Sequence, residues 1–395
     1  MKYGFASRVQ HLKSSAVRDI LKVINKGNVI SFAGGLPDDD LFPVDAVKAA
    51  FEKTFQAGKH TLQYAETEGI APFRELLVER MAKNKIQSKV DDILVTTGSQ
   101  QAIDLFTRIM CNPGDVILTE NPTYLAALQV FQSYEVNVKP VLSDEYGMIP
   151  EDLNQKIKQY NPKCVYVVPT FSNPTGKVWS LERRKQLLEV CKKRNVVIFE
   201  DDPYGELKFN DQETYTPIAA LDEEGTHVLY TSTFSKTVVP ALRIGWIKGP
   251  HQIIRMMAQA KQAADLHTNS LAQHALVHLF QDFDVEEHIQ KLRKVYYSRM
   301  LIMKELLDSI TLPGFSYLEP KGGMFFWVSM PEEIDVTKLL KVAVKKGVAY
   351  VPGAPFYVEK PQKNTLRLNY THSTPEKLEK GMKILTEVFS EVAVK

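Results

Sequence analysis

The sequence lacks the features of a secreted, membrane-spanning or metal-binding protein. Its 395 residues include three cysteines, Cys111, Cys164 and Cys191, with no CxxC pair and no histidines at zinc-ligand spacing. We therefore expect free thiols and no metal site. No stretch approaches the ~20 apolar residues of a membrane-spanning helix, and the first residues lack the apolar run of a signal peptide. These absences predict a cytoplasmic protein without a membrane anchor.

An excess of charge of one sign is also missing. Lys and Arg total 49 against 47 for Asp and Glu, which gives a formal net charge of +2, and the two signs are interspersed along the chain. Without a basic tract, neither nucleic acid nor an anionic membrane is the expected partner. The balance favours a small-molecule substrate. We find no internal repeat and no low-complexity linker.

The middle of the chain alternates short apolar runs with amphipathic helical patterns. The runs are "ILVTT" (93–97), "VILTE" (116–120), "KCVYVVP" (163–169), "NVVIFED" (195–201), "HVLYTS" (227–232) and "RIGWIKG" (243–249). Near-continuous apolar strands separated by helices predict an α/β fold with a mainly parallel sheet covered on both faces.

The alternation of strands and helices changes near residue 285. The chain is also longer than a domain with a single hydrophobic core usually is. A long polar helix is followed by "KGGMFFWVSM", another helix and "TLRLNYTH", which together indicate a smaller α+β domain. We predict a large domain over residues 46–285 and a small domain over residues 286–395, and we expect the N-terminal segment, residues 1–45, to become part of the small domain.

Polar residues follow several of the predicted strands. Gly98, Ser99, Gln100, Asn173, Asp201, Tyr204 and Lys236 all lie just after an apolar run. In parallel sheets, ligands bind outside the carboxyl ends of the strands. We therefore expect these residues to gather at one edge of the sheet.

Lys236 has neighbours that suit a reactive amine. Thr233 and Ser235 precede it, and Arg243 follows seven residues later. Burial and a nearby cation lower the pKa of a lysine, while hydroxyl and guanidinium groups bind phosphate. This predicts a lysine that forms a Schiff base beside a phosphate site.

Residues that follow other predicted strands could take part in the same chemistry, although each of them could also have a purely structural role. Ser99 begins a predicted helix whose free N–H groups favour phosphate, but it could simply cap that helix. Asp201 could hold a proton on a heteroaromatic nitrogen or end its strand in solvent. Asn173 offers a donor and an acceptor, or merely forms a turn.

Taken together, these motifs resemble a known family. "SNPTG" (172–176), "EDDPY" (200–204), "STFSK" (232–236) with "LRIG" (242–245), and "TLRLNY" (365–370) are similar to the signature of fold-type I pyridoxal-phosphate aminotransferases of class I and II. The resemblance covers essentially the whole chain. "ISFAGGLPD", "LQYAETEG", "AKQAADLHTN" and "KGGMF" most resemble the branch of 2-aminoadipate and kynurenine aminotransferases.

The resemblance implies a fold, a cofactor and a reaction. The large domain would hold a mainly parallel seven-stranded sheet between helices, and the cofactor would be pyridoxal 5'-phosphate. The enzyme would move the α-amino group of an amino acid (2-aminoadipate, aromatic or branched-chain) to a 2-oxo acid, 2-oxoglutarate above all, with ping-pong kinetics. It would work as a homodimer with shared active sites.

The resemblance also assigns roles to single residues. Lys236 would form the Schiff base, Asp201 would pair with the pyridine nitrogen, and Tyr204 and Asn173 would contact the ring phenolate oxygen. Tyr124, otherwise a core tyrosine, would stack on the ring. The phosphate would be bound by Ser99, Gln100, Thr233, Ser235, Arg243 and, from the partner subunit, Tyr64. Thr233 replaces the serine of many relatives and retains the hydroxyl.

Four residues would bind the substrate, namely Arg18, Gly35, Arg367 and Asn173, which also contacts the cofactor. Arg367 would bind the α-carboxylate, and the alternation of Leu366 and Leu368 independently directs Arg367 away from the core. Gly35 would leave room for the carboxylate. Arg18 would bind a distal carboxylate from a mobile helix in the N-terminal segment, although periodicity alone makes it a solvated helix residue.

Two alternatives remain. A pyridoxal-phosphate β-lyase has nearly the same sequence features. Some regulators resemble this fold but carry an N-terminal winged-helix module; because the family-like sequence starts within the first tens of residues here, we expect a regulator of this kind to lack that module.

Overall fold

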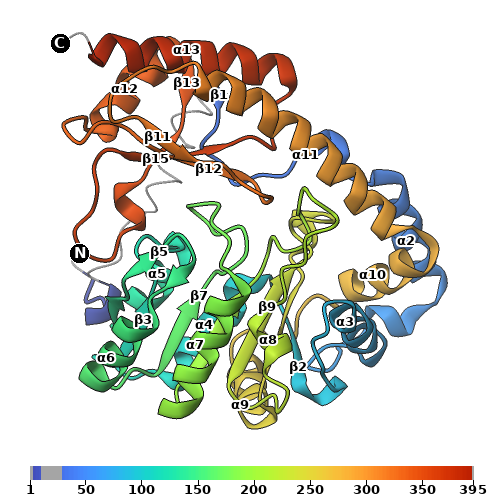
Figure 1. Ribbon diagram of the computed structural model, residues 1–395. Helices are drawn as coiled ribbons and strands as arrows, with labels where there is room; N and C mark the ends of the chain where they lie inside the picture. Colours follow the sequence, from blue (N-terminus) through green and yellow to red (C-terminus); the bar gives the residue numbers. More distant parts are fainter. Residues whose placement is uncertain (1–2, 10–28, 394–395) are drawn as a thin grey trace.

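The computed structural model describes residues 3–9 and 29–393 of the chain. Its larger part is built on a seven-stranded sheet (Figure 1). In spatial order the strands are β2 (Ile93–Thr96), β10 (Gly245–Lys248), β9 (Val228–Thr233), β8 (Val197–Asp201), β7 (Cys164–Val167), β3 (Val116–Thr119) and β4 (Asn137–Pro140). Strand β10 runs antiparallel to both neighbours, while the other pairs are parallel.

Helices cover both faces of this sheet because successive strand residues point to opposite sides. Phe199 and Leu229 pack with α4 (Ser99–Met110), α5 (Leu125–Ser133) and α9 (His251–Gln262). Their neighbours Ile198 and Val228 pack on the other face. The helices there are α3 (Ala71–Lys83), α6 (Pro150–Tyr160), α7 (Leu181–Arg194), α8 (Ile218–Leu221) and α10 (Ser270–Asp282), and α2 (Val44–Gln56) lies against α10. Because helices cover both faces of the large sheet, strand residues that point to either side are apolar. This explains the near-continuous hydrophobic runs in the sequence.

A second, antiparallel sheet lies above the first in Figure 1. Its strands, in order, are β11 (Ser316–Leu318), β12 (Phe325–Ser329), β15 (Thr365–Asn369) and β14 (Val351–Pro352). Helices α11 (Val285–Asp308), α12 (Val336–Lys346) and α13 (Pro375–Ala393) accompany it. Strand β1 (Ile30–Ser31) pairs in parallel with β13 (Val348–Ala349), so the segment after residue 29 joins this part of the molecule.

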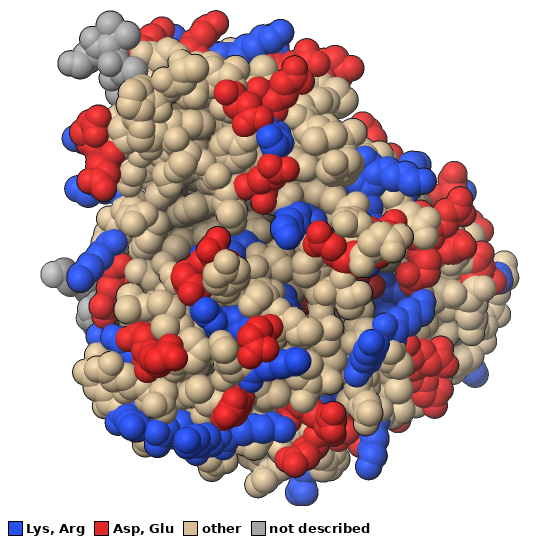
Figure 2. Space-filling view, viewed as in Figure 1, with Lys and Arg blue, Asp and Glu red and all other residues tan. Residues whose placement is uncertain are grey.

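The remaining elements are short. They are the strands β5 (Ser143–Asp144) and β6 (Gly147–Met148) and the 3-10 turns η1 (Ser7–Val9), η2 (Asp39–Leu41), η3 (Lys59–Leu62), η4 (Val90–Asp92), η5 (Pro240–Leu242) and η6 (Ala354–Phe356). Within the described ranges, no helix combines the length and apolarity that a membrane span requires. Acidic and basic side chains are both scattered over the face in Figure 2, with uncharged surface between them.

The predicted α/β class and the mainly parallel seven-stranded sheet are confirmed. Each predicted run contains a strand, but β4 was not anticipated. The run 243–249 begins its strand only at Gly245, because Arg243 adopts a left-handed conformation with φ 55°. The domain limits at 45/46 and 285/286 stay predictions.

Candidate active site

A cavity of about 740 Å³ lies between the strand ends of the large sheet and the small sheet. It gathers all the predicted site residues except Arg18 and Tyr64. These residues are Gly35, Ser99, Gln100, Tyr124, Asn173, Asp201, Tyr204, Thr233, Ser235, Lys236, Arg243 and Arg367. The described part of the chain holds no group of three His, Cys, Asp or Glu residues that could bind a metal ion.

Lys236 lies in the turn that follows strand β9. Its Nζ donates a hydrogen bond to the Gly35 carbonyl at 2.8 Å. Burial, together with the positive charges of Arg367 and Arg243, lowers the pKa of Lys236 to about 8. A substantial fraction of this amine is therefore neutral near pH 8, as a nucleophile or proton acceptor must be.

Asp201 is the last residue of β8 and is almost fully buried. Its Oδ2 accepts a hydrogen bond from the Tyr166 hydroxyl at 2.8 Å, whereas its buried Oδ1 has no partner among the described residues. Burial raises the pKa of Asp201 to about 7, against the opposing effect of Tyr166. A buried carboxylate oxygen beside a cavity requires a donor, and a protonated ring nitrogen would supply one.

The N-terminus of α4 and the guanidinium of Arg243 approach each other closely at one end of the cavity. A Cβ on Gly98, which has φ 74°, would lie 2.6 Å from Arg243 Nη2, and a Cβ on Gly245 would lie 2.7 Å from Ser99 N. Arg243 Nη1 donates to Ser235 Oγ at 3.3 Å. Helix N–H groups, a hydroxyl and a guanidinium therefore converge where the two glycines leave room, which suits a phosphate.

Three further side chains complete this end. Thr233 Oγ1 lies 2.9 Å from Ser235 Oγ and 2.9 Å from the Ile244 carbonyl. Tyr124 precedes α5, and its hydroxyl donates to Gln100 Oε1 at 3.4 Å. Burial raises the pKa of Tyr124 to about 12, so the hydroxyl stays protonated at neutral pH.

Arg367 enters the cavity from the middle of β15 and is 3% exposed. Its Nη1 donates to Asn173 Oδ1 at 2.6 Å and its Nη2 to the Ala33 carbonyl at 2.8 Å. The guanidinium carbon lies 4.2 Å from the ring centre of Phe325 and 5.3 Å from that of Phe356. Burial lowers the pKa of Arg367 to about 10, so it remains charged. No carboxylate in the described ranges pairs with it, so the geometry suits an incoming anion.

Tyr204 lies beside Arg367 and Asn173 and is buried. Its ring packs edge to face on Phe325, with 5.9 Å between ring centres. Burial raises the pKa of Tyr204 above its ordinary range, and a hydrogen bond with Asn173 opposes that rise. The phenol therefore stays a hydrogen-bond donor at neutral pH.

Two predicted residues are not part of this assembly. Tyr64 is 78% exposed and stands away from the cavity, with its ring edge-on to His267. Arg18 lies outside the described residues. Sequence reasoning missed Tyr166 and Phe356; nothing in the sequence fixes the strand register that brings Tyr166 to Asp201, or the fold of the loop that carries Phe356.

The family model for aminotransferase class I and II matches residues 27–385, and the chain belongs to this family. The aromatic-amino-acid aminotransferase 1 of Thermococcus litoralis is 40% identical, with 98% of this chain and 94% of the relative covered. The crystal structure of Pyrococcus horikoshii kynurenine aminotransferase is 41% identical at a TM-score of 0.93, over 98% of this chain and 97% of that one. The α-aminoadipate aminotransferase LysN of Thermus thermophilus is 32% identical at a TM-score of 0.92, over 99% and 98%.

The protein is therefore a fold-type I aminotransferase that depends on pyridoxal 5'-phosphate, as the sequence predicted. The cavity fits this cofactor. Asp201 Oδ1 offers an unpaired acceptor for the ring nitrogen, and Lys236 has the lowered pKa that attack on the aldehyde requires. The cluster at the start of α4 fits the phosphate.

Proposed function

We propose that this aminotransferase accepts several donors, namely 2-aminoadipate, aromatic and branched-chain amino acids, and passes the amino group to 2-oxoglutarate. The observation that carries the proposal is the buried, carboxylate-free guanidinium of Arg367 in the same cavity as the low-pKa amine of Lys236. The first would hold any α-carboxylate, whatever the side chain. The relatives described above act on aromatic, kynurenine and aminoadipate donors, which supports breadth.

In the proposed mechanism, the chain contributes binding, orientation and proton transfer. Arg367 binds the substrate α-carboxylate, and Gly35 leaves space for it. Once free, Lys236 Nζ removes the proton from the substrate Cα. The bound cofactor supplies the electron sink that this proton removal needs. Asp201 holds a proton at the ring nitrogen, which maintains that sink.

The other residues fix the cofactor in place. Tyr204 and Asn173 would contact the ring oxygen, and Tyr124 would stack on the ring. The phosphate is held by Ser99, Gln100, Thr233, Ser235 and Arg243. Together these residues would hold the phosphate, the ring face and the ring oxygen, and would so restrict how the cofactor can turn.

We further propose a homodimer in which Tyr64 reaches the phosphate of the partner's site. Its 78% exposure in one protomer supports this, since a tyrosine usually buries its ring. Mixing Lys236→Ala protomers with Tyr64→Phe protomers should restore one intact site per heterodimer. Recovery no greater than that of the parents, with subunit exchange shown separately, would contradict sharing.

The buried thiols of Cys164 and Cys191 support a reducing, cytoplasmic location.

A panel of single half-reactions tests the donor range. Each of L-2-aminoadipate, L-phenylalanine and L-leucine is mixed with the holoenzyme, and loss of the absorption band of the Lys236-bound cofactor is followed. We expect all three to react, and a reaction with only one class would contradict the proposed breadth. Pyruvate released from a β-substituted amino acid without any oxo acid would instead indicate a β-lyase.

A further inference from the structure

The segment from residue 33 to residue 38 contacts two of the three cationic side chains that line the cavity, Lys236 and Arg367, through its backbone. The Ala33 carbonyl accepts from Arg367 Nη2, and the Gly35 carbonyl accepts from Lys236 Nζ, both at 2.8 Å. These two acceptors are two residues apart. A shift of this short segment would therefore change the surroundings of both cations together.

The start of the segment is held by backbone pairing. Ile30 pairs with Val348 between β1 and β13, and the Phe32 carbonyl accepts from Asn369 N at 2.8 Å. Asn369 is the last residue of β15, the strand that carries Arg367. This end is therefore attached to the small sheet.

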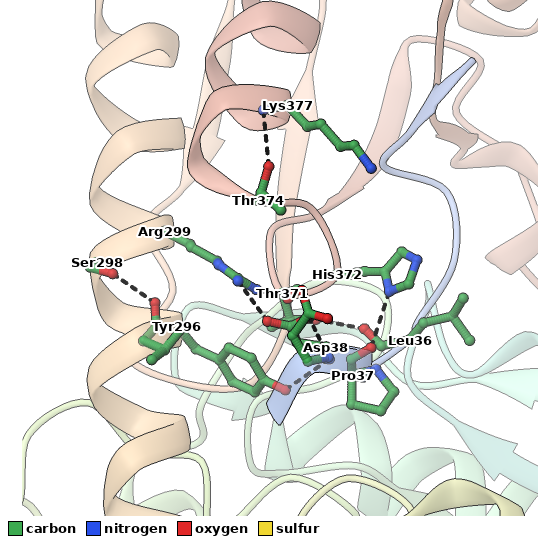
Figure 3. A network of polar contacts seen from close by, with 12 residues as sticks. Leu36, Pro37, Asp38, Tyr296, Ser298, Arg299, Thr371, His372, Thr374 and Lys377 are labelled. Carbon is green, nitrogen blue, oxygen red and sulfur yellow. Dashed lines mark hydrogen bonds and ion pairs between the residues drawn. The ribbon is translucent and has the colours of Figure 1, made fainter. Parts of the chain in front are cut away.

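The other end is held by side chains, in the network of Figure 3. Arg299 reaches from α11 to Asp38, with 2.6 Å between Nη2 and Oδ2. The Asp38 amide also donates to the Tyr296 hydroxyl at 3.2 Å. Both charged side chains are buried, at 7% and 6% exposure.

Arg299 links this end to the residues that follow β15. Its Nη1 donates to the Thr371 carbonyl, and Thr371 Oγ1 donates to the Leu36 carbonyl at 2.8 Å. His372 Nδ1 lies 3.1 Å from the Pro37 carbonyl beside it. One guanidinium thus joins α11, the segment 33–38 and the end of β15.

Stability alone does not account for a buried ion pair. Removing two charges from water costs about as much as their attraction returns, and apolar residues of similar volume often stabilise a fold as well. The pair instead fixes the position of Asp38 relative to α11 and to the residues that follow β15.

We propose that Asp38 and Arg299 are positioning residues for transamination. By anchoring the segment 33–38, they hold the Ala33 and Gly35 carbonyls where these orient Arg367 and Lys236. The proposal rests on the function given above, in which Arg367 binds the α-carboxylate and Lys236 moves the proton. Misplacing a binding group by about 1 Å can cost about 100-fold in rate.

The test uses two variants of the holoenzyme. Asp38→Asn removes one charge, and the double change Asp38→Leu with Arg299→Met replaces the pair by apolar side chains, which keeps the core filled if the single variant folds poorly. For each, Tm, cofactor content, and kcat and KM for L-phenylalanine are measured. Binding of 3-phenylpropionate, a carboxylate without an amino group, is measured by calorimetry. Lys304→Ala, which breaks the exposed Lys304–Asp308 pair on the same helix, is the control.

We expect the double variant to keep its cofactor, to bind 3-phenylpropionate about tenfold more weakly and to lose at least as much in kcat/KM, through KM because Arg367 is displaced and through kcat because Lys236 is displaced. Lys304→Ala should change neither. A folded, cofactor-loaded double variant with unchanged affinity and kcat/KM overturns the proposal, because the pair would then be purely structural. Loss of Tm alone, with full activity per bound cofactor, overturns it as well.

Arg367→Lys separates this failure from a failure of the proposed function. If Arg367→Lys weakens 3-phenylpropionate and the double variant does not, the carboxylate role of Arg367 stands and only the positioning proposal falls. If Arg367→Lys also leaves binding unchanged, the assignment of Arg367 is wrong and the positioning proposal falls with it.

Discussion

The two sheets supply site residues in different ways. From the large sheet, Asp201 comes from the end of a strand, Lys236 from a turn and Ser99 from the start of a helix. From the small sheet, Arg367 comes from mid-strand, opposite Trp327 in β12 and Val351 in β14. A residue paired on both sides has little freedom to move, whereas a turn can change conformation. We infer that the backbone that carries Arg367 is held on both sides, whereas the backbone that carries Lys236 is held less firmly.

Among the site residues that come from the large sheet, Lys236 should show the largest loss of activity when it is replaced, in Lys236→Ala. Because it removes the group that moves the Cα proton, kcat should fall by about 10⁴-fold. The protein should still bind the cofactor through the phosphate contacts, but borohydride should no longer fix the cofactor at residue 236. Peptide mapping and half-reaction rates check both points. A rate near that of the unaltered enzyme would exclude Lys236 as the proton carrier.

Asp201→Asn should have the next largest effect. The amide can still accept from Tyr166 but carries no charge to keep a proton on the ring nitrogen, so kcat should fall by about 100- to 1,000-fold while Tm changes little. Tyr166→Phe, which removes only the supporting hydroxyl, should cost about tenfold. Equal rates for Asp201→Asn and the unaltered enzyme would refute the assigned role.

The pH at which Lys236 loses its proton should show how the small sheet acts on the large one. In cofactor-free protein, acetylation of Lys236 should rise with a midpoint near pH 8, because burial and the two arginines disfavour the charged amine. Removing one cation by Arg367→Met should move that midpoint to higher pH. Mass spectrometry of the labelled peptide gives the profile, and a midpoint near the ordinary 10.5 would contradict it.

Arg367→Lys tests the carboxylate-binding role of the residue that comes from the small sheet. Lysine keeps the charge but loses the forked geometry, so kcat/KM should fall by about 10- to 100-fold for every donor. The loss should be uniform because all donors share the α-carboxylate. Steady-state kinetics with leucine, phenylalanine and 2-aminoadipate measure it, and a loss confined to one donor would point to a side-chain pocket instead.

Arg18→Ala should have the narrowest effect. Arg18 lies outside the described residues, and its proposed role is to bind a distal carboxylate. KM for 2-aminoadipate or 2-oxoglutarate should rise by about one to two decades, whereas leucine and phenylalanine should change by less than about threefold. Comparing the donors in one preparation checks this. Equal losses for both classes would mean that Arg18 supports the fold or the dimer.

The sequence predicted the strand-end residues well because the parallel strands end at one edge, so order along the chain translates into position. It also directed Arg367 correctly, since alternation along a strand is a local property. It did not anticipate that β10 runs antiparallel, because the apolar pattern of a strand carries no direction. The contact of Tyr166 with Asp201 depends on inter-strand register, which is not encoded locally. The role proposed for Tyr64 would need a second chain, so one protomer does not test it.

The excursion between β9 and β10, residues 234–244, carries Lys236 and two of the groups around the proposed phosphate site, Ser235 and Arg243. Because the strands at its two ends are hydrogen-bonded to each other, the backbone of this short stretch would keep the Lys236 side chain within a limited distance of the proposed phosphate site. A molecule can bond to the amine and reach the anion-binding end only if its aldehyde and its anionic group lie a set distance apart. If the phosphate binds there as proposed, vitamers that lack the phosphate, or that carry it on a longer arm, would satisfy one end and miss the other.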